Sequence, residues 1–161
     1  MNEPIYLYAD GSSRGNPGPG GYGVILKCGN HYKELSGGFS KTTNNRMELL
    51  GVISGLEALK KRDLPIKVYS DSSYVVRAIN EGWLSKWLVK GLRRHKNPDL
   101  WQRYLNISKG LDIEFNWIKG HAGHPENERC DALAVAAAMQ LDLKEDAGYI
   151  EVNNNNNALL L

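Results

Sequence analysis

The sequence lacks the features that mark several common protein classes. It has two cysteines among 161 residues, Cys28 and Cys130, and they stand far apart and outside any C-x-x-C pattern. This spacing argues against a disulfide scaffold and suits a reducing compartment. No apolar run approaches the roughly 20 residues that a membrane-spanning helix needs, and the N-terminus has no basic region of a signal peptide. We therefore expect a cytoplasmic protein that does not associate with a membrane.

A strong excess of one charge is also missing. The formal net charge is +2, which does not by itself indicate a nucleic-acid partner, so only the distribution of charge could do so. The length fits one domain, which we place at residues 1–148, and we expect a monomer. The remaining residues, 149–161, include the run Asn153–Asn157, which cannot build a core, and we predict a disordered tail there.

The order of predicted elements is that of an α/β domain. Strands over Ile5–Asp10, Tyr22–Cys28 and Tyr32–Phe39 are joined by short turns, which predicts an antiparallel part of a sheet. The later elements are a helix from Thr42 or Thr43 to about Lys60, a strand over 65–70, helices over 72–80, in part of 82–96 and over 99–108, a strand over 112–118 and a helix from Pro125 to about Gln140. This order predicts a mixed five-stranded sheet.

Four acidic residues stand at positions where acids are uncommon. Asp10 ends the first predicted strand and Asp71 ends the fourth, where ligands of α/β folds often collect. Glu48 shares a helical face with Val52 and Leu59, and Asp131 shares one with Ala134, Val135, Ala138 and Met139. Both helical acids are therefore predicted to face the core.

Each of these acids has a simpler explanation. The alternatives are a turn residue for Asp10, a helix cap for Asp71, the helix macrodipole for Glu48 and an ion pair with Arg129 or Arg46 for Asp131. Taken together, four half-buried carboxylates are costly unless positive charge compensates them. Hard oxygen ligands suit Mg²⁺ or Mn²⁺, and a pair of such ions suits phosphoryl transfer. The segment GNPGPGG lacks the lysine and the spacing of a P-loop, so cleavage of a nucleic-acid backbone is favoured over nucleotide hydrolysis.

A resemblance to a known family is carried by four motifs in order: YADGSSRGNPGPGGYGV, TTNNRMELLGVISGLEAL, VYSDSSYV and WIKGHAGHPENERCDALA. Together they resemble ribonuclease HI over about Ile5–Met139. The resemblance implies the ribonuclease H-like fold, with helices on both faces of the sheet. It also implies an endonuclease that uses Mg²⁺, with Mn²⁺ able to substitute, at two ions per site in the substrate complex. Its substrate would be the RNA strand of an RNA–DNA hybrid, cut to leave 3′-hydroxyl and 5′-phosphate ends.

The resemblance also implies roles for single residues. Asp10, Glu48, Asp71 and Asp131 match the metal-binding catalytic carboxylates, with Asp10 shared by both ions, and Glu48 would lie near the 2′-hydroxyl. His121 matches a histidine that assists proton transfer or product release, for which a histidine is suited near neutral pH. On this interpretation the first strand ends at Asp10 because its end is a metal ligand. The glycines after it would let the backbone approach a duplex.

Further positions match family contacts to the hybrid, although each has a structural alternative. Reading RNA requires contact with the 2′-hydroxyl, and asparagine amides both donate and accept hydrogen bonds. The matching residues are Asn16, Thr43, Asn44 and Asn45, then Ser73, where many members have glutamine, and the basic and aromatic set Trp83, Lys86, Trp87, Lys90, Arg93 and Arg94. Helix capping is the alternative for Asn44 and Asn45, and core packing is the alternative for the tryptophans. The basic region looks shorter than in better-known bacterial members.

Two other functions compete with this one. A related polynucleotidyl transferase, such as an integrase or a junction resolvase, would share the acids at the strand ends but lack the asparagine set and the GHAGHPENE loop. A module that binds hybrids without cutting them would need no catalytic acids, whereas all four are present in this sequence.

Overall fold

The computed structural model describes residues 3–151 and contains a mixed sheet of five strands. The strands are β1 (Ile5–Ser13), β2 (Gly18–Cys28), β3 (His31–Thr42), β4 (Ile66–Ser70) and β5 (Ile113–Trp117). Their spatial order is β3-β2-β1-β4-β5. β1, β2 and β3 pair antiparallel, and β4 is parallel to both β1 and β5. The predicted mixed five-stranded sheet is therefore confirmed.

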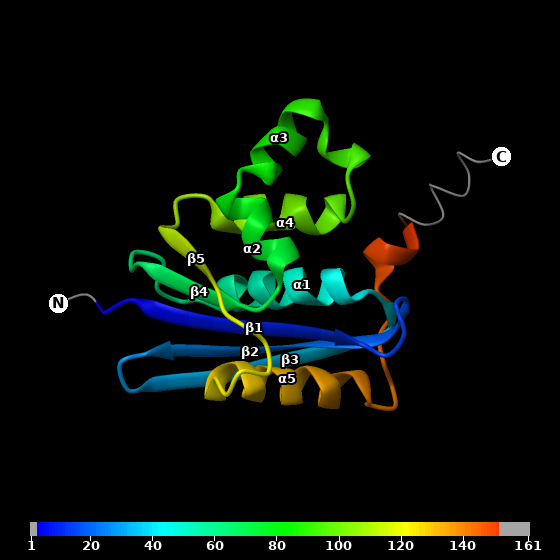
Figure 1. Cartoon of the computed structure of the whole chain (residues 1–161), viewed down its shortest axis with the longest axis horizontal. Helices are drawn as coiled ribbons and strands as arrows, with labels where there is room; N and C mark the ends of the chain where they lie inside the picture. The colour runs from blue at the N-terminus through cyan, green and yellow to red at the C-terminus, as the bar shows by residue number, and fades with distance from the viewer. Residues whose placement is uncertain (1–2, 152–161) are drawn as a thin grey trace.

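Helices cover both faces of this sheet (Figure 1). They are α1 (Asn44–Glu57), α2 (Ser73–Asn80), α3 (Trp83–Lys90), the short 3₁₀ helix η1 (Leu92–Arg94), α4 (Pro98–Ser108) and α5 (Pro125–Ala138). α1, α2 and α4 lie on one face, α3 projects beyond them, and α5 lies against the opposite face (Figure 1). Among residues 3–151, no helix has the length and apolarity to cross a membrane.

Helix α1 packs against the sheet through the apolar face that its sequence predicts. Leu49, Val52 and Leu56 are fully buried, and Leu59 packs at the margin of the same core. The helix begins where Thr43 caps it, since the Thr43 hydroxyl accepts a hydrogen bond from the backbone N–H of Arg46 at 3.3 Å. This start fixes which residues of the first two turns face the sheet.

The glycine-rich segment after Asp10 is mostly strand, which corrects the prediction that the first strand ends at Asp10. β1 continues to Ser13 and β2 begins at Gly18, so only residues 14–17 form the turn. Asp10 itself is paired with Gly23 inside the sheet. The prediction was wrong because clustered glycine and proline usually mark a loop, whereas these glycines serve packing.

Two of these glycines show what the missing side chains allow. A Cβ atom on Gly11 would overlap the α1 backbone at Met47 and Glu48. A Cβ atom on Gly23 would overlap the carbonyl oxygen of Cys130 in α5. Glycine thus lets both helices approach β1 and β2 closely, and at Gly11 this brings α1 beside Asp10.

The buried face of α5 differs from the predicted one. Cys130, Ala134, Ala137 and Ala138 are buried, whereas Val135 and Met139 are 36% and 56% exposed. The prediction placed Val135 and Met139 inside because they share a helical face with Asp131, Ala134 and Ala138. Close packing on the glycines of β2 favours the small side chains instead, and Asp131 lies half-buried at the edge of this face.

The backbone of residues 147–151 is helical. The asparagine run for which disorder was predicted lies outside the described residues, so the division of the chain near residue 148 stays a prediction.

Candidate active site

The pairing of β1 with β4 brings two of the predicted acids together. The last pair in this parallel ladder is Ala9 with Ser70, so Asp10 and Asp71 are the next residues along the two neighbouring strands. Parallel strands end at the same edge of a sheet, and here β4 ends while β1 continues. The two carboxylates therefore meet at a step in the sheet.

Glu48 completes the cluster from above the sheet. It lies in the second turn of α1, which Gly11 allows to approach β1. One carboxylate oxygen from each of Asp10, Glu48 and Asp71 lies within 4.8 Å of the others. Asp10 is 4% exposed and Glu48 is 6% exposed, whereas Asp71 is half-buried. Three acids that are distant in the sequence thus share one small site.

Burial and mutual repulsion disfavour ionisation in this cluster. Burial, followed by the charge of Asp71, raises the pKa of Asp10 to about 7. Burial, followed by the charge of Asp10, also raises the pKa of Glu48 well above its ordinary value. Within residues 3–151, none of the ion pairs includes Asp10, Glu48 or Asp71. The cluster therefore lacks a protein cation to compensate its charge.

The cluster fits a hard divalent cation. The Oε2 atom of Glu48 is buried and has no hydrogen-bond partner within the described residues. The Oδ1 atom of Asp10 accepts one hydrogen bond, from the backbone N–H of Gly11 at 2.9 Å. A buried oxygen without a partner is costly, and a cation would satisfy it. Because all the potential metal-ligand atoms are carboxylate oxygens, Mg²⁺ or Mn²⁺ suits the cluster better than zinc.

Asp131 lies near this group but is not one of the three. It is half-buried on α5, and its negative charge contributes to raising the pKa of Asp10. The proposed ion pair with an arginine does not form, since Arg129 binds Glu34 at 2.7 Å and Arg46 binds two other aspartates. The simpler explanation for Asp131, an ion pair with one of these arginines, is therefore excluded.

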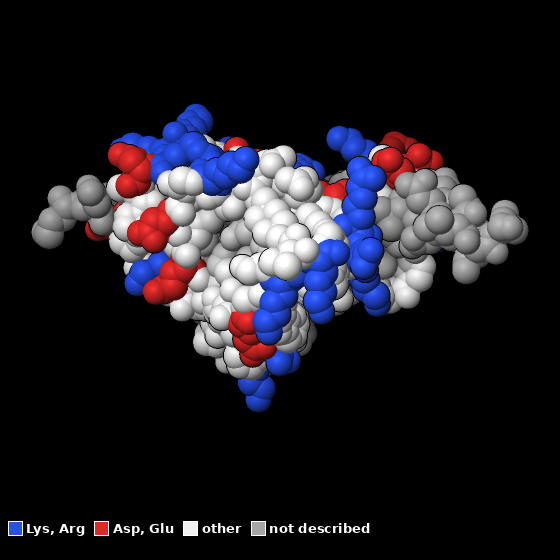
Figure 2. Space-filling view, turned by 90° about the horizontal axis from the view of Figure 1, so that it is seen from above, with Lys and Arg blue, Asp and Glu red and all other residues white. Residues whose placement is uncertain are grey.

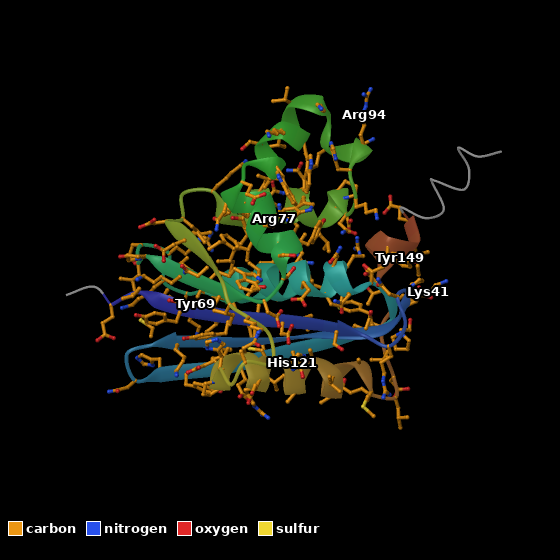
Figure 3. The ribbon with its side chains drawn as sticks, in the orientation of Figure 1. Lys41, Tyr69, Arg77, Arg94, His121 and Tyr149 are labelled. Atoms are coloured by element: carbon orange, nitrogen blue, oxygen red, sulfur yellow. The ribbon has the colours of Figure 1, made fainter. Side chains whose placement is uncertain are left out.

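His121 stands on the exposed loop between β5 and α5 (Figure 3). Its backbone φ is +54°, in the left-handed region that residues other than glycine seldom adopt. Such a conformation costs on the order of 1 kcal/mol or more and is often found at functional sites. The structure thus places His121 on a loop beside the acidic cluster, since the neighbouring Gly120 lies against the carboxylate of Asp71.

The predicted asparagines gather at the N-terminus of α1. The Oδ1 atom of Asn16 accepts a hydrogen bond from the backbone N–H of Asn44 at 3.0 Å, which leaves the Asn16 amide N–H₂ as a donor. Because Thr43 is the cap, neither Asn44 nor Asn45 has to fill that role, and both are exposed. Capping therefore does not explain these two side chains.

At the other strand end, the helix-cap alternative for Asp71 also fails. Ser72 is the cap of α2, and its hydroxyl accepts from the backbone N–H of Val75 at 3.2 Å. Ser73 follows as the first residue of the helix, and its side chain is exposed.

The two predicted tryptophans are partly buried and have structural contacts of their own. The guanidinium of Arg77 lies 4.7 Å from the ring centroid of Trp83. The Trp87 ring lies between His95, at 5.1 Å, and Trp101, at 5.8 Å. The core-packing alternative thus describes much of their environment.

Basic residues of the segment after α3 line a hollow of about 410 Å³. Its lining includes the bases Arg93, Arg94 and Lys96 together with Asn16 and Thr43. Viewed from above, a row of Lys and Arg side chains crosses the molecule on the side where the chain ends (Figure 2). Lys86, Lys90, Arg93 and Arg94 are exposed and take part in none of the ion pairs found in residues 3–151.

Sequence reasoning missed two features of this region. Tyr149, which we had assigned to the tail, lines the same hollow as Arg94 (Figure 3). Trp117 at the end of β5 is 55% exposed and donates a hydrogen bond to the backbone of Asp71. No signal in the sequence separates Trp117 from the tryptophans of the core, because tryptophan is common both in cores and at interfaces.

Comparison with known proteins gives consistent matches. The family model for RNase H matches residues 2–139. A curated protein named "Ribonuclease H" from Desulforamulus reducens is 56% identical over 147 residues, covering 88% of this chain and 92% of that protein. The solved structure of LC9-RNase H1, described as a type 1 RNase H with the type 2 active-site motif, has a TM-score of 0.75 and 32% identity, covering 86% of this chain and 73% of that one. The structure of LC11-RNase H1 in complex with RNA/DNA hybrid has a TM-score of 0.62 and 28% identity, covering 83% of this chain and 96% of that one.

Proposed function

This chain belongs to the RNase H family, and on that basis we propose that it is a metal-dependent endonuclease that hydrolyses the RNA strand of RNA–DNA hybrids. The observation that carries the proposal is the cluster of Asp10, Glu48 and Asp71, whose oxygens lie within 4.8 Å of one another without a compensating base in the described residues. The hybrid found with LC11-RNase H1 supports the substrate class.

The proposed reaction is in-line attack of water on an RNA phosphodiester, leaving 3′-hydroxyl and 5′-phosphate ends. When bound, two Mg²⁺ ions, or Mn²⁺ in their place, supply activation of the water and stabilisation of the leaving oxygen. Asp10 would hold both ions. Glu48 and Asp71 would complete one site and Asp131 the other, with Glu48 also near the 2′-hydroxyl.

His121 would assist the movement of protons at this site. Its exposed position on the β5–α5 loop leaves the imidazole free to accept a proton and release it to water. The backbone of His121 has a φ of +54°, a strained conformation that an unconstrained loop would avoid. This strain supports the proposal that the fold holds His121 in a specific position.

Contacts at the start of α1 would distinguish RNA from DNA. The free amide N–H₂ of Asn16 and the exposed side chains of Asn44 and Asn45 offer donors and acceptors to a 2′-hydroxyl. Thr43 lies at the helix N-terminus, where backbone N–H groups favour a phosphate.

The elements beyond α1 would hold the rest of the duplex. We propose that the exposed bases of α3 and the following segment contact its backbone by charge. Ser73, Trp83 and Trp87 stay proposed contacts, with the tryptophans also serving the core.

We further propose that the chain acts as a monomer in the cytoplasm. Cys28 and Cys130 are both free thiols, which suits a reducing compartment. Light scattering after size-exclusion chromatography would give a mass near 18.0 kDa for a monomer.

A cleavage assay on four labelled substrates tests the proposed activity. The substrates are an RNA–DNA hybrid, duplex RNA, duplex DNA and single-stranded RNA, each with Mg²⁺ and with EDTA. We expect cutting of the hybrid alone, on its RNA strand and only with metal, with product ends identified by their reaction with ligase and phosphatase. Asp71→Asn should abolish it, whereas Asp63→Asn, on an exposed loop, should not. A hybrid that binds the protein yet stays intact with Mg²⁺ and Mn²⁺ would instead indicate a binding module.

A further inference from the structure

Asp71 differs from the other two acids of the cluster in how it is held. Asp10 lies inside β1, where it pairs with Gly23, and Glu48 lies inside α1. Asp71 belongs to no strand or helix, since β4 ends at Ser70 and α2 begins at Ser73. It is also the more exposed of the three. Its carboxylate must therefore be placed by contacts from elsewhere.

One such contact is made by Trp117 on the neighbouring strand. Trp117 pairs with Ser70 at the end of β5, and its indole Nε1–H donates to the backbone oxygen of Asp71 at 3.1 Å. The ladder continues one step further, because the N–H of Ile118 donates to the oxygen of Ser70 at 3.0 Å. The indole thus holds the peptide that carries the Asp71 side chain.

The second constraint on the Asp71 carboxylate comes from Gly120, which has no side chain. A Cβ atom placed there would lie 2.6 Å from Oδ2 of Asp71 and 3.3 Å from its Cγ. Gly120 is not among the glycines with positive φ, so its backbone conformation is open to alanine. The space that a side chain at residue 120 would fill is occupied by the Asp71 carboxylate.

We propose that Trp117 and Gly120 are positioning residues for Asp71 and thereby set the affinity of the acidic cluster for a divalent cation. The inference rests on the proposed function, because it concerns the same cluster. Trp117 fixes the backbone of Asp71 from one side, and Gly120 leaves its carboxylate free to turn toward Asp10 and Glu48. Groups that orient metal ligands typically change metal affinity by about 10- to 100-fold when they are lost.

If the role of Trp117 were purely structural, a variant without its indole N–H would lose stability. Its side chain is 55% exposed, and it is not among the residues of the hydrophobic core. Removal of its N–H would therefore cost little stability, because water can replace the contact at an exposed site. The measurable consequence should appear in metal binding rather than in the melting temperature.

The first test compares Trp117→Phe with Tyr32→Phe. Each removes a single side-chain hydrogen bond from an exposed aromatic residue, and Tyr32 bonds Glu34 near the start of β3, whereas Asp10 lies level with Ser36 in the middle of that strand. Calorimetric titration of Mn²⁺ into metal-free protein should give about tenfold weaker binding for Trp117→Phe and no change for Tyr32→Phe. The turnover number on the hybrid should recover at saturating metal. Unchanged Mn²⁺ binding, or lost turnover that metal does not restore, would overturn the role of Trp117.

The second test compares Gly120→Ala with Gly51→Ala. Both add one methyl group, but a Cβ on Gly51 meets only ordinary contacts, the nearest at 3.4 Å. At Gly120 the methyl displaces the end of a flexible side chain, so the fold should tolerate it while the carboxylate moves. We expect Mn²⁺ binding to weaken at least about tenfold in Gly120→Ala, with a melting temperature close to that of Gly51→Ala. Equal Mn²⁺ affinities in the two variants would overturn the role of Gly120.

The titration of the unmodified protein separates this inference from the proposed function. If the unmodified protein binds no Mn²⁺, the metal-dependent function fails and the inference fails with it. If it binds Mn²⁺ and both variants bind equally well, only the positioning role is wrong.

Discussion

The carboxyl groups of Asp10 and Glu48 are both buried, and the charge of Asp71 hinders ionisation of Asp10 while the charge of Asp10 hinders ionisation of Glu48. Burial and neighbouring charge raise the pKa of Asp10 to about 7, and the pKa of Glu48 is raised in the same direction. Near neutral pH the metal-free cluster therefore holds protons that ordinary aspartate and glutamate would have released. A cation must displace these protons, which couples metal binding to pH.

The affinity for divalent cations should consequently fall as the pH drops below about 7. The pKa of Asp10 is about 7, so each proton that must leave costs about tenfold in affinity per pH unit below it. Titration of Mn²⁺ at pH 8, 7 and 6 checks this, and repetition in buffers of different ionisation enthalpy counts the released protons. Affinity that stays flat between pH 8 and pH 6 would contradict the assigned protonation.

The same pKa predicts the stability of the metal-free protein. The pKa of Asp10 rises from 3.8 when unfolded to about 7 when folded, so the folded state binds the extra proton between these values. The contribution of this proton to the free energy of unfolding is fully present below pH 4 and is lost as the pH rises through 7. Asp10→Asn cannot ionise, so in EDTA its free energy of unfolding should exceed that of the unmodified protein by about 2–4 kcal/mol at pH 8 and by less at pH 5.

Urea denaturation of both proteins at the two pH values measures this difference. Asp63→Asn, which changes an exposed acid, serves as the control. A difference that is the same at pH 5 and pH 8 would show that Asp10 does not titrate in this range.

At the scale of elements, a buried arginine joins three parts of the chain. Arg46 of α1 is 2% exposed and binds Asp99 of α4 and Asp146 near the end of the described chain, each at 2.7 Å. Asp146 also accepts a hydrogen bond from the hydroxyl of Thr42 at 2.7 Å. Because Arg46 is fully engaged, its guanidinium organises the hollow that it lines instead of binding a phosphate there.

Removal of one partner from this network should be costly. Asp146→Asn leaves the buried charge of Arg46 less compensated, and we expect the free energy of unfolding to fall by about 3 kcal/mol. Glu57→Gln is the matched control, because its ion pair with Arg103 has side chains that are 34% and 48% exposed. That pair should contribute at most about 1 kcal/mol. Denaturant melts of the two variants at pH 7 measure the contrast, and equal losses would contradict a buried network.

The sequence predicted elements well where one periodicity dominates. The buried face of α1 follows from the spacing of Leu49, Val52 and Leu56, and each strand was found near its observed position. It failed where close packing replaces a turn signal, as at Gly11 and Gly23, because composition does not indicate what a glycine faces.

The candidate site was predictable for a related reason. Asp10 and Asp71 follow directly after Ala9 and Ser70, the last pair of the parallel ladder between β1 and β4, so the pairing of these two strands brings them together. The contacts of Arg46 with Asp99 and Asp146 span 53 and 100 residues, and no local pattern records them. The hydrogen bond from Trp117 to the backbone of Asp71 also joins residues that are far apart in the sequence, and no periodic pattern indicates it.

For the whole molecule, the helix α1 links the basic hollow to the acidic cluster. Thr43 lines the hollow, and Glu48 lies five positions further along, which is about 7.5 Å of helix. A duplex whose phosphates enter the hollow would thus present neighbouring groups to the carboxylates. Under the proposed function, attraction of the hybrid at the hollow and metal-dependent cleavage at the cluster are separable, since different residues carry them.

This separation predicts how salt acts on the enzyme. The formal net charge is only +2, so the attraction for a hybrid must come from local bases and not from the molecule as a whole. Arg93→Ala with Arg94→Ala removes two exposed bases of the hollow and should raise the KM for the hybrid while leaving the turnover number unchanged. The slope of log KM against log salt should become shallower by about 1–2, because each lost phosphate contact releases about one counterion fewer. Lys61→Ala with Lys109→Ala makes the same change in net charge at exposed positions outside the hollow and should keep the original slope. If both double variants change the slope equally, overall charge rather than the hollow governs binding.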